Sequence, residues 1–246
     1  MKIVGSAPTR ISMFGGGTDL DPFASEEGGR IINVAINIRS EASTGITVTN
    51  PIVLPLTLAI SRYFSLPADL GVSSWFGGII GAGLGSSGSA AVLLTAMAAR
   101  VTGKELSAQE LLETAWKIET ETLGKTGIQD HVAALYGGGN DIVIYSLTNF
   151  SIERGEIYPG TVRKLRPYLL LFYLGGQRDS HEMQKTLQDK KSLFLSKEIC
   201  NQAVEAFVQE EFETMGSLLN ETWKLKKLSN PQMTTPVIDQ IYEAGM

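Results

Sequence analysis

The chain has 246 residues, of which 43% are hydrophobic, and a formal net charge of −5 at pH 7. This length fits one large domain or two small ones. The acidic balance argues against a general nucleic-acid binder, and no apolar run reaches the roughly 18–20 residues that a membrane span requires. The single cysteine, Cys200, cannot form an intramolecular disulfide, which fits a reducing cytoplasm, and we expect it to be a small buried hydrophobe.

The first third of the sequence alternates strand patterns with glycine turns. Two short strands are expected at residues 2–5 and 9–14, interrupted by Pro8, and three consecutive glycines then form a turn before Thr18 and Asp19. Residues 31–38 alternate isoleucine and valine with polar residues, which predicts a strand. Asn50 and Pro51 can open a helix that runs to residue 64, whereas residues 75–80 make a poor strand.

The rest of the chain is increasingly helical. We expect helices from the turn at residues 83–91 to about 101, at 107–123 after a capping box, and at 129–136. Strand patterns follow at 141–147, 151–157 and 167–174. Residues 179–227 have a helical pattern with a break near 192–196, and a last helix starts near 235. The pattern predicts an α+β protein of two lobes, residues 1–150 and 151–246.

A glycine- and serine-rich turn leads directly into an apolar helix. Glycines let backbone N–H groups approach an anion closely, and the first turn of a helix leaves its N–H groups without intrahelical partners. The turn lacks the lysine of a Walker A loop, and its G-x-G-x-x-G spacing lacks the strand and acidic residue of a dinucleotide site. A glycine turn that only caps a buried helix is the alternative. The candidate phosphate-binding residues are Gly83, Leu84, Gly85, Ser86, Ser87, Gly88 and Ser89.

Separate segments supply the other parts that phosphoryl transfer needs, which are a divalent ion and a carboxylate facing the acceptor hydroxyl. Asp19 follows a glycine turn and can point into open space to accept hydrogen bonds from sugar hydroxyls, or it can satisfy its own backbone. Glu119 lies on a helix, with Glu121 as its competitor, and Asp130 lies at the start of the next helix.

These segments resemble the GHMP kinases, a family named for galactokinase, homoserine kinase, mevalonate kinase and phosphomevalonate kinase. The resemblance runs over nearly the whole chain and is strongest to the sugar 1-kinases that act on D-glycero-D-manno-heptose 7-phosphate. It implies a two-lobed fold with a ribosomal S5-like N-terminal lobe and a helical, ferredoxin-like C-terminal lobe. The matching stretches are APTRIS at residues 7–12, GGGTD at 15–19, GLGSS at 83–87, GIQDHVAALYGG at 127–138 and LLLFY at 169–173.

The resemblance implies a role for each carboxylate. Asp130 would orient the acceptor hydroxyl and take its proton, with Arg10 beside it to keep the carboxylate ionised and to stabilise developing charge. Ser87 and Glu119 match the family's Mg²⁺ ligands, and hard oxygen donors suit that ion. His131 invites the role of general base, but we expect it to be part of the scaffold.

Gly17, Thr18 and Asp19 would bind the sugar. Arg30 and Arg178 are candidates for holding a substrate phosphate, because a guanidinium fork fits that geometry, and surface arginines are the alternative. The lysines of residues 223–227 are expected on a solvated helix face, although one of them could reach a sugar phosphate.

The sequence departs from the family pattern in two places. The region between residues 42 and 83 is short, and no glycine-rich strand-turn of the family's third motif follows residue 230. We therefore expect the C-terminal lobe to be incomplete.

The sequence predicts a cytoplasmic, ATP- and Mg²⁺-dependent kinase for the anomeric hydroxyl of D-glycero-D-manno-heptose 7-phosphate, in the supply of nucleotide-heptose for surface glycans. Its partners would be the sugar phosphate and ATP, without nucleic acid or membrane, and a homodimer is compatible with the sequence. The alternatives are a fucokinase- or galactokinase-like sugar 1-kinase and a catalytically inactive protein that binds sugar or nucleotide.

Overall fold

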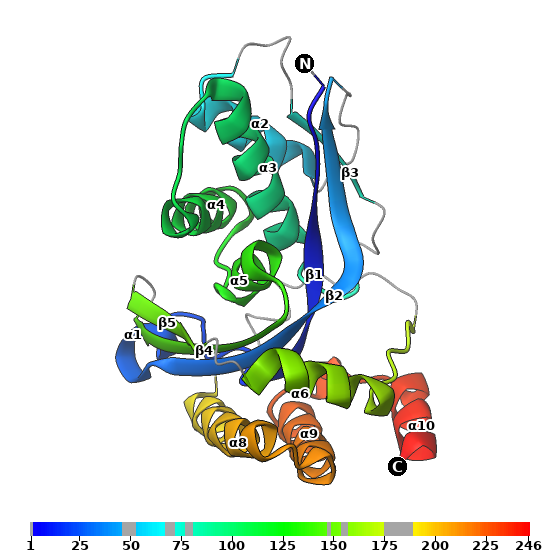
Figure 1. Cartoon of the computed structure of the whole chain (residues 1–246). Coiled ribbons are helices and arrows are strands. Elements are labelled where there is room, and N and C mark those ends of the chain that lie inside the picture. The colour runs from blue at the N-terminus through cyan, green and yellow to red at the C-terminus, as the bar shows by residue number, and fades with distance from the viewer. Residues whose placement is uncertain are drawn as a thin grey trace. The chain divides into compact units, whose positions relative to one another are not determined.

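The computed structural model describes residues 2–45, 53–66, 72–76, 81–146, 149–153, 157–174 and 189–246 (Figure 1). Its strands are β1 (Val4–Phe14), β2 (Gly29–Thr44), β3 (Val72–Phe76), β4 (Gly139–Ser146) and β5 (Asn149–Glu153). Its helices are α1 (Phe23–Glu27), α2 (Val53–Tyr63), α3 (Ser86–Thr102), α4 (Ala108–Leu123), α5 (Gln129–Tyr136), α6 (Ile157–Leu165), α8 (Lys190–Gln209), α9 (Phe212–Ser229) and α10 (Pro236–Gly245). Among these helices, none is both long and apolar enough to cross a lipid bilayer.

The chain divides into two compact units that are discontinuous in sequence. The first unit comprises Met1–Ile11 and Asn33–Asn140, and the second comprises Ser12–Ile32 and Asp141–Met246. We predicted a division near residue 150, whereas the second unit begins ten residues earlier and also includes an N-terminal segment. The reason is that β1 and β2 are long strands, and the turn and short helix α1 between them pack with the C-terminal helices.

The first unit has a helical core around α3. Small residues make this helix the central one, because Ala90, Ala91 and Ala98 let neighbouring helices approach closely, and α3 contacts α2, α4 and α5. Figure 1 shows these four helices on one side of the strands of the unit. The capping box predicted from Ser107 and Glu110 is present at the start of α4, with both reciprocal hydrogen bonds formed.

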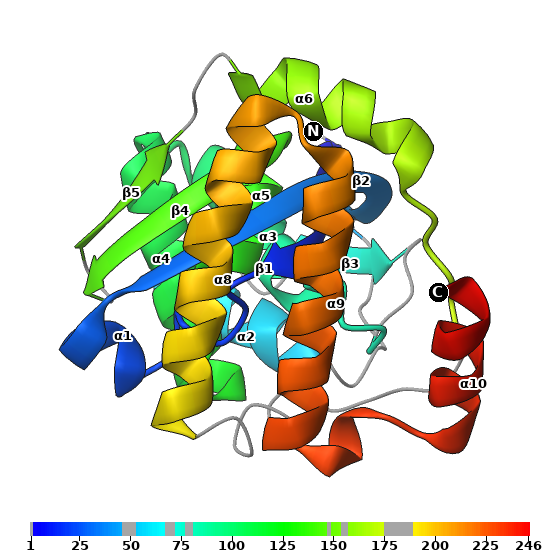
Figure 2. The same cartoon turned by 90° about the horizontal axis from the view of Figure 1, so that it is seen from below.

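The second unit places a helical hairpin beside strands β4 and β5. α8 and α9 lie side by side (Figure 2), joined by only two residues. β4 pairs with β5 in antiparallel register from Asp141 opposite Glu153 to Ser146 opposite Asn149, with an irregularity between Ile144 and Ser146. The described core of this unit consists of Met13, Phe14, Phe23, Ala24, Ile31, Ile32, Ile142, Ile144, Leu165, Cys200, Ala203, Ala206, Phe207, Met215 and Leu218.

The sheet follows the order β1-β2-β4-β5, and β3 also pairs with β2. Three predictions about its strands are wrong. β1 is continuous through Pro8, which an edge strand tolerates because one side of it forms no ladder. β3 is a strand despite the weak pattern of its sequence, because it pairs with β2 from Ser40 opposite Phe76 to Thr44 opposite Val72. Residues 167–174 form no strand, and their apolar side chains from 170 to 174 are exposed.

The predicted helix breaks are partly correct. α8 begins at Lys190, where Asp189 accepts hydrogen bonds from two backbone N–H groups as the N-cap, and the predicted helical residues 179–188 lie outside the described part. The predicted break at 192–196 is wrong, because the chain turns instead at Glu210, whose φ of 58° is left-handed. α9 ends before Asn230, as the following proline predicts.

Candidate active site

Asp130 and Arg10 form the centre of a site in the first unit. Asp130 lies in the first turn of α5 and Arg10 lies on β1. Two guanidinium nitrogens approach the same carboxylate oxygen: Nε lies 2.7 Å and NH2 lies 2.5 Å from Oδ1. Both side chains are largely buried, with 10% of Arg10 and 14% of Asp130 exposed, so water screens this pair only weakly. The predicted neighbourhood of these two residues is therefore confirmed.

Arg10 also fixes the glycine-rich turn that precedes α3. Its NH1 donates to the carbonyl oxygen of Gly83 at 2.6 Å, and its backbone N–H donates to the carbonyl oxygen of Leu84 at 2.9 Å. One arginine thus joins the turn to the carboxylate of Asp130 across more than seventy residues of sequence.

Two glycines of the turn are needed because Asp130 lies against them. A Cβ added to Gly85 would lie 2.7 Å from Cγ of Asp130, and one added to Gly88 would lie 2.5 Å from its Cβ. A Cβ on Gly83 would meet nothing within 4 Å, although its φ of +74° is as left-handed as that of Gly85, at +70°. Glycine is therefore required at positions 85 and 88 because the Asp130 side chain packs there, whether or not these residues also bind phosphate.

The serines at the start of α3 have different environments. Ser86 and Ser87 are partly exposed, and the helix leaves its first N–H groups without partners of the i−4 type. Ser89 is fully buried, its hydroxyl donates to the carbonyl oxygen of Ala7 at 3.1 Å, and its N–H is bonded to Gly85. The side chain of Ser89 therefore ties α3 to β1, and the two partly exposed serines are those that can contact an anion.

Glu119 on α4 meets His131 on α5 in the interior of the first unit. Oε2 of Glu119 lies 2.6 Å from Nε2 of His131, and the two side chains are 1% and 0% exposed. The ring N–H is not directed along the line of a regular hydrogen bond, so the contact is defined by its distance. Glu121 is exposed, so burial distinguishes Glu119 as the residue that can face an interior site.

The start of α5 is fixed by side chains that no motif indicated. Asn33 on β2 donates to the backbone carbonyl of Gln129 at 2.8 Å, and Asn140 donates to the amide oxygen of Asn33 at 2.9 Å. Both asparagines are fully buried. The only sequence signal was that Asn33 interrupts an apolar strand. Trp116 adds a tether, because its indole N–H donates to the carbonyl of Thr126 in the loop before α5.

The predicted sugar-binding turn lies in the second unit and is tightly packed. A Cβ on Gly15 would lie 1.9 Å from the backbone oxygen of Arg30, and one on Gly29 would lie 2.2 Å from that of Thr18. The Thr18 hydroxyl donates to the carbonyl of Gly15 at 2.8 Å and accepts from the N–H of Arg30. Thr18 therefore shapes the turn. Asp19 is 2% exposed, so the expectation that it points into open space is wrong, because the folded chain buries it.

Arg30 is engaged by a carboxylate that the sequence did not indicate. Its Nε and NH2 donate to the two oxygens of Asp141 at 2.9 and 2.6 Å, a bidentate pair in which Asp141 is buried. Its NH1 donates to Asn201 at 3.3 Å. The second arginine candidate, Arg178, lies outside the described residues. Lys226 on α9, by contrast, places its Nζ 3.7 Å from where a Cβ on Gly16 would be.

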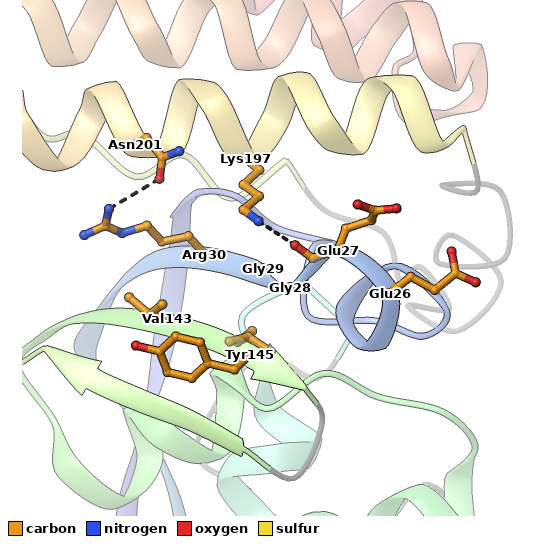
Figure 3. Close-up of a pocket in the computed structure, with 10 residues that line it drawn as sticks. Glu26, Glu27, Gly28, Gly29, Arg30, Val143, Tyr145, Lys197 and Asn201 are labelled. Atoms are coloured by element: carbon orange, nitrogen blue, oxygen red, sulfur yellow. Dashed lines mark hydrogen bonds between the residues drawn. The ribbon is translucent and has the colours of Figure 1, made fainter.

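A cavity of about 340 Å³ opens in the second unit beside Arg30 (Figure 3). Lys197 closes one side, since its ammonium donates to the carbonyl of Glu27 at 2.6 Å, and Tyr145 lies on another. Charges of both signs line the cavity, and none of the residues proposed for chemistry in the first unit does so. Its lining consists of Glu26, Glu27, Gly28, Gly29, Arg30, Val143, Ile144, Tyr145, Lys197 and Asn201.

Cys200 packs against the same part of the second unit. Its Sγ lies 3.2 Å from where a Cβ on Gly15 would be, and its side chain is fully buried. Burial, reinforced by the negative charge of Asp141, raises the pKa of the Cys200 thiol far above its ordinary value. The expected small buried hydrophobe is confirmed.

In the part of the chain that the structure describes, no three histidine, cysteine, aspartate or glutamate side chains gather as a metal site. The predicted Mg²⁺ site would have a different composition, because Ser87 and Glu119 would each supply one hard oxygen donor and nucleotide phosphates would supply the rest. The donor types fit Mg²⁺, and the His131 ring that contacts Glu119 also lies 3.4 Å from the Cβ position of Gly88, next to Ser87.

Comparison with known proteins identifies the first unit. Residues 56–138 match the model of the GHMP kinases N-terminal domain. This range contains the glycine-rich turn, Glu119, Asp130 and His131. The chain is also 23% identical over 287 residues to the D-glycero-alpha-D-manno-heptose 7-phosphate kinase of Campylobacter jejuni, covering 97% of this chain and 81% of that protein.

Solved structures share the fold. A D-glycero-D-manno-heptose 1-phosphate kinase from Bacteroides thetaiotaomicron superposes with a TM-score of 0.77 at 20% identity, covering 92% of this chain and 79% of that one. The phosphomevalonate kinase of Streptococcus pneumoniae in complex with phosphomevalonate and AMPPNP superposes with a TM-score of 0.72 at 14% identity, covering 98% and 85%.

The predicted resemblance and the α+β GHMP-kinase-like fold are both confirmed by these matches. Residues 56–138 therefore form a GHMP kinase N-terminal domain, and the chain has the fold of the GHMP kinases.

Proposed function

We propose that this protein is a GHMP kinase that transfers the γ-phosphoryl group of ATP to the anomeric hydroxyl of a sugar, with D-glycero-D-manno-heptose 7-phosphate as the substrate. The observation that carries the proposal is the Arg10–Asp130 pair, which is buried against the glycine-rich turn at 2.5–2.7 Å. Similarity to a heptose 7-phosphate kinase supports the choice of sugar. The lone buried cysteine supports a cytoplasmic location, where ATP and Mg²⁺ are available.

Asp130 would accept the proton of the attacking hydroxyl. Both contacts of Arg10 are made to Oδ1, so Oδ2, which is nearer to the Cβ position of Gly85, is the oxygen that would take the proton. The oxygen of the sugar then bonds to the γ-phosphorus as the bond to the ADP oxygen breaks. The guanidinium of Arg10 holds the carboxylate in one orientation and adds positive charge beside the reacting groups.

The start of α3 would hold the phosphates. Ser86 and Ser87 are partly exposed beside N–H groups that have no i−4 partner, and the helix dipole favours negative charge there. Hydrogen bonds from Arg10 to the carbonyls of Gly83 and Leu84 keep the turn in one conformation without any bound ligand. A turn fixed in advance loses less conformational entropy when the nucleotide binds.

Mg²⁺ would be held by the hydroxyl of Ser87 and the carboxylate of Glu119, together with phosphate oxygens. When bound, the ion neutralises phosphate charge and orients the transferred group. Glu119 fits this role because it is a buried carboxylate whose partner, His131, lies beside the residue that follows Ser87.

The turn of the second unit would supply the sugar contacts. We propose the backbone at Gly17 for the hydroxyls. We propose Lys226 for the substrate phosphate in addition to Arg30, because its ammonium lies 3.7 Å from the Cβ position of Gly16 in this turn. A lysine binds phosphate as a compact charge, which requires no fixed fork geometry.

A coupled assay of ADP release tests the proposal. D-glycero-D-manno-heptose 7-phosphate should be phosphorylated, while the unphosphorylated heptose, fucose and galactose should react at least tenfold more slowly. Asp130→Asn should lower kcat by about 10²–10⁴-fold, the usual contribution of a general base, while ATP binding measured by calorimetry stays unchanged. Glu121→Gln, an exposed carboxylate on α4, is the matched control and should retain full activity.

Equal rates with and without the 7-phosphate would overturn the choice of substrate. Nucleotide binding without turnover on any of these sugars would show a binding protein instead of an enzyme.

A further inference from the structure

We propose that His131 is a positioning residue that orients the Glu119 carboxylate toward the metal ion. The inference rests on the proposed function, since it assigns the neighbour of Asp130 a task in holding Mg²⁺ with nucleotide. It assigns this task to the side chain that the sequence suggested was only scaffold.

The first reason is burial. Both side chains lie in the interior of the first unit, 0% and 1% exposed, with Nε2 of His131 at 2.6 Å from Oε2 of Glu119. At this distance Nε2 is the ring atom that can donate to the carboxylate, although the angle in this structure is not that of a regular hydrogen bond. A carboxylate taken out of water needs such a partner, because removing it would leave a buried charge uncompensated.

The second reason is the place of the ring. Cε1 of His131 lies 3.4 Å from where a Cβ on Gly88 would be, so the imidazole occupies the space between the start of α3 and Glu119 on α4. Gly88 directly follows Ser87, the other proposed metal ligand. The ring therefore sets the separation between the two segments that would hold the ion.

The third reason is the anchoring of His131 itself. It follows Asp130, whose carboxylate is fixed by Arg10, and it lies on a helix whose start is held by Asn33 through the carbonyl of Gln129. With its backbone held and its side chain fully buried, the imidazole has little freedom to rotate. An oriented donor on a metal-binding carboxylate typically changes metal affinity by about 10–100-fold.

Manganese binding measures this role without relying on turnover. Free Mn²⁺ is followed by electron paramagnetic resonance in the presence of AMPPNP, with wild type, His131→Gln, His131→Asn and His131→Leu. Gln can place an amide N–H where Nε2 lies, whereas Asn is too short and Leu has no donor. We expect the apparent Kd for Mn²⁺ to rise about tenfold in the Asn and Leu variants and less than about twofold in the Gln variant.

A double-mutant cycle with Glu119→Gln separates positioning from general damage. If His131 acts through Glu119, adding His131→Asn to the Glu119→Gln variant should weaken Mn²⁺ binding by less than about twofold further. In kinetic assays the Asn variant should raise the Mg²⁺ concentration for half-maximal rate while the KM for the sugar stays unchanged. Thermal unfolding without ligands identifies any variant that fails to fold. If His131→Leu fails to fold, the comparison of His131→Gln with His131→Asn still tests the proposal.

Equal Mn²⁺ affinity in the Gln and Asn variants, or full additivity with Glu119→Gln, would overturn the proposal. A wild-type chain that binds Mn²⁺ with AMPPNP but phosphorylates no sugar would refute the proposed function and leave this inference standing.

Discussion

The molecule contains two glycine-rich turns, and different kinds of group pack against the glycines of each. In the first unit, Gly85 and Gly88 make room for a side chain, the carboxylate of Asp130. In the second unit, Gly15 of the turn and Gly29 at the start of β2 make room for backbone, since their Cβ atoms would lie 1.9 and 2.2 Å from carbonyl oxygens. The two turns look alike in sequence, yet the first packs against the side chain of Asp130 and the second packs against backbone.

The difference predicts different consequences when a methyl group is added. A turn packed against backbone cannot relax without moving strands, so its glycines should control stability. A turn packed against one side chain can relax by displacing that side chain, so its glycines should control catalysis. Substitutions in each turn, with matched controls at positions of equal backbone conformation, test this distinction.

The largest effect is expected for Gly15→Ala. The added Cβ meets the Arg30 carbonyl oxygen at 1.9 Å, and φ at Gly15 is +72°. Overpacking and left-handed strain together should lower the free energy of unfolding by roughly 3–5 kcal/mol. Gly103→Ala, at φ +68° with nothing within 4 Å, is the control and should lose about 1–2 kcal/mol in urea unfolding. Equal losses would show that backbone strain alone matters.

The next effect is expected for Gly85→Ala. Its Cβ would lie 2.7 Å from Cγ of Asp130, so the carboxylate must shift away from Arg10 and from its productive position. We expect kcat to fall about 10–100-fold, because displacements of this size can cost up to two orders of magnitude. Gly103→Ala, at φ +68° with nothing within 4 Å, has the same left-handed backbone without the contact, and should lose similar stability but less than about threefold in kcat. Matching kcat values for the two variants would refute the role of the contact.

The smallest expected effect is on the reactivity of the Cys200 thiol, which packs against the turn at Gly15 in the second unit. Because its pKa is raised, the thiol stays protonated at pH values near 8, and its sulfur is shielded beside Gly15. Folded wild-type protein should react with Ellman's reagent only as fast as it opens, and Gly85→Ala should leave that rate unchanged. Gly15→Ala should speed the reaction. Rapid labelling of the folded wild type would contradict the packing described for this turn.

The sequence anticipated much of the first unit for local reasons. The capping box at Ser107 and the glycine boundary before α3 are decided by residues within a few positions of one another. The ordered motifs likewise predicted that Arg10, Asp130 and the turn belong to one site. Their contacts then followed from a fold that the motifs had already indicated.

Predictions failed where the deciding partner lies far away in the sequence. β3 has a weak strand pattern, and only the ladder with β2 makes it a strand. Arg30 looked available to a phosphate until Asp141, 111 positions later, was found to hold it. His131 gave no local sign that Glu119 lies beside it, since the contact depends on how α4 and α5 pack.

By itself, the sequence indicated the resemblance to the GHMP kinases and several helix starts, such as the capping box of α4, because short-range hydrogen bonding and motif spacing encode them. Only the tertiary structure decided which glycines are required by a side chain and which by backbone. It also decided which charged groups are already paired, such as Arg30 with Asp141 and Glu119 with His131. These properties depend on distances across the fold, which a linear pattern of residue types does not contain.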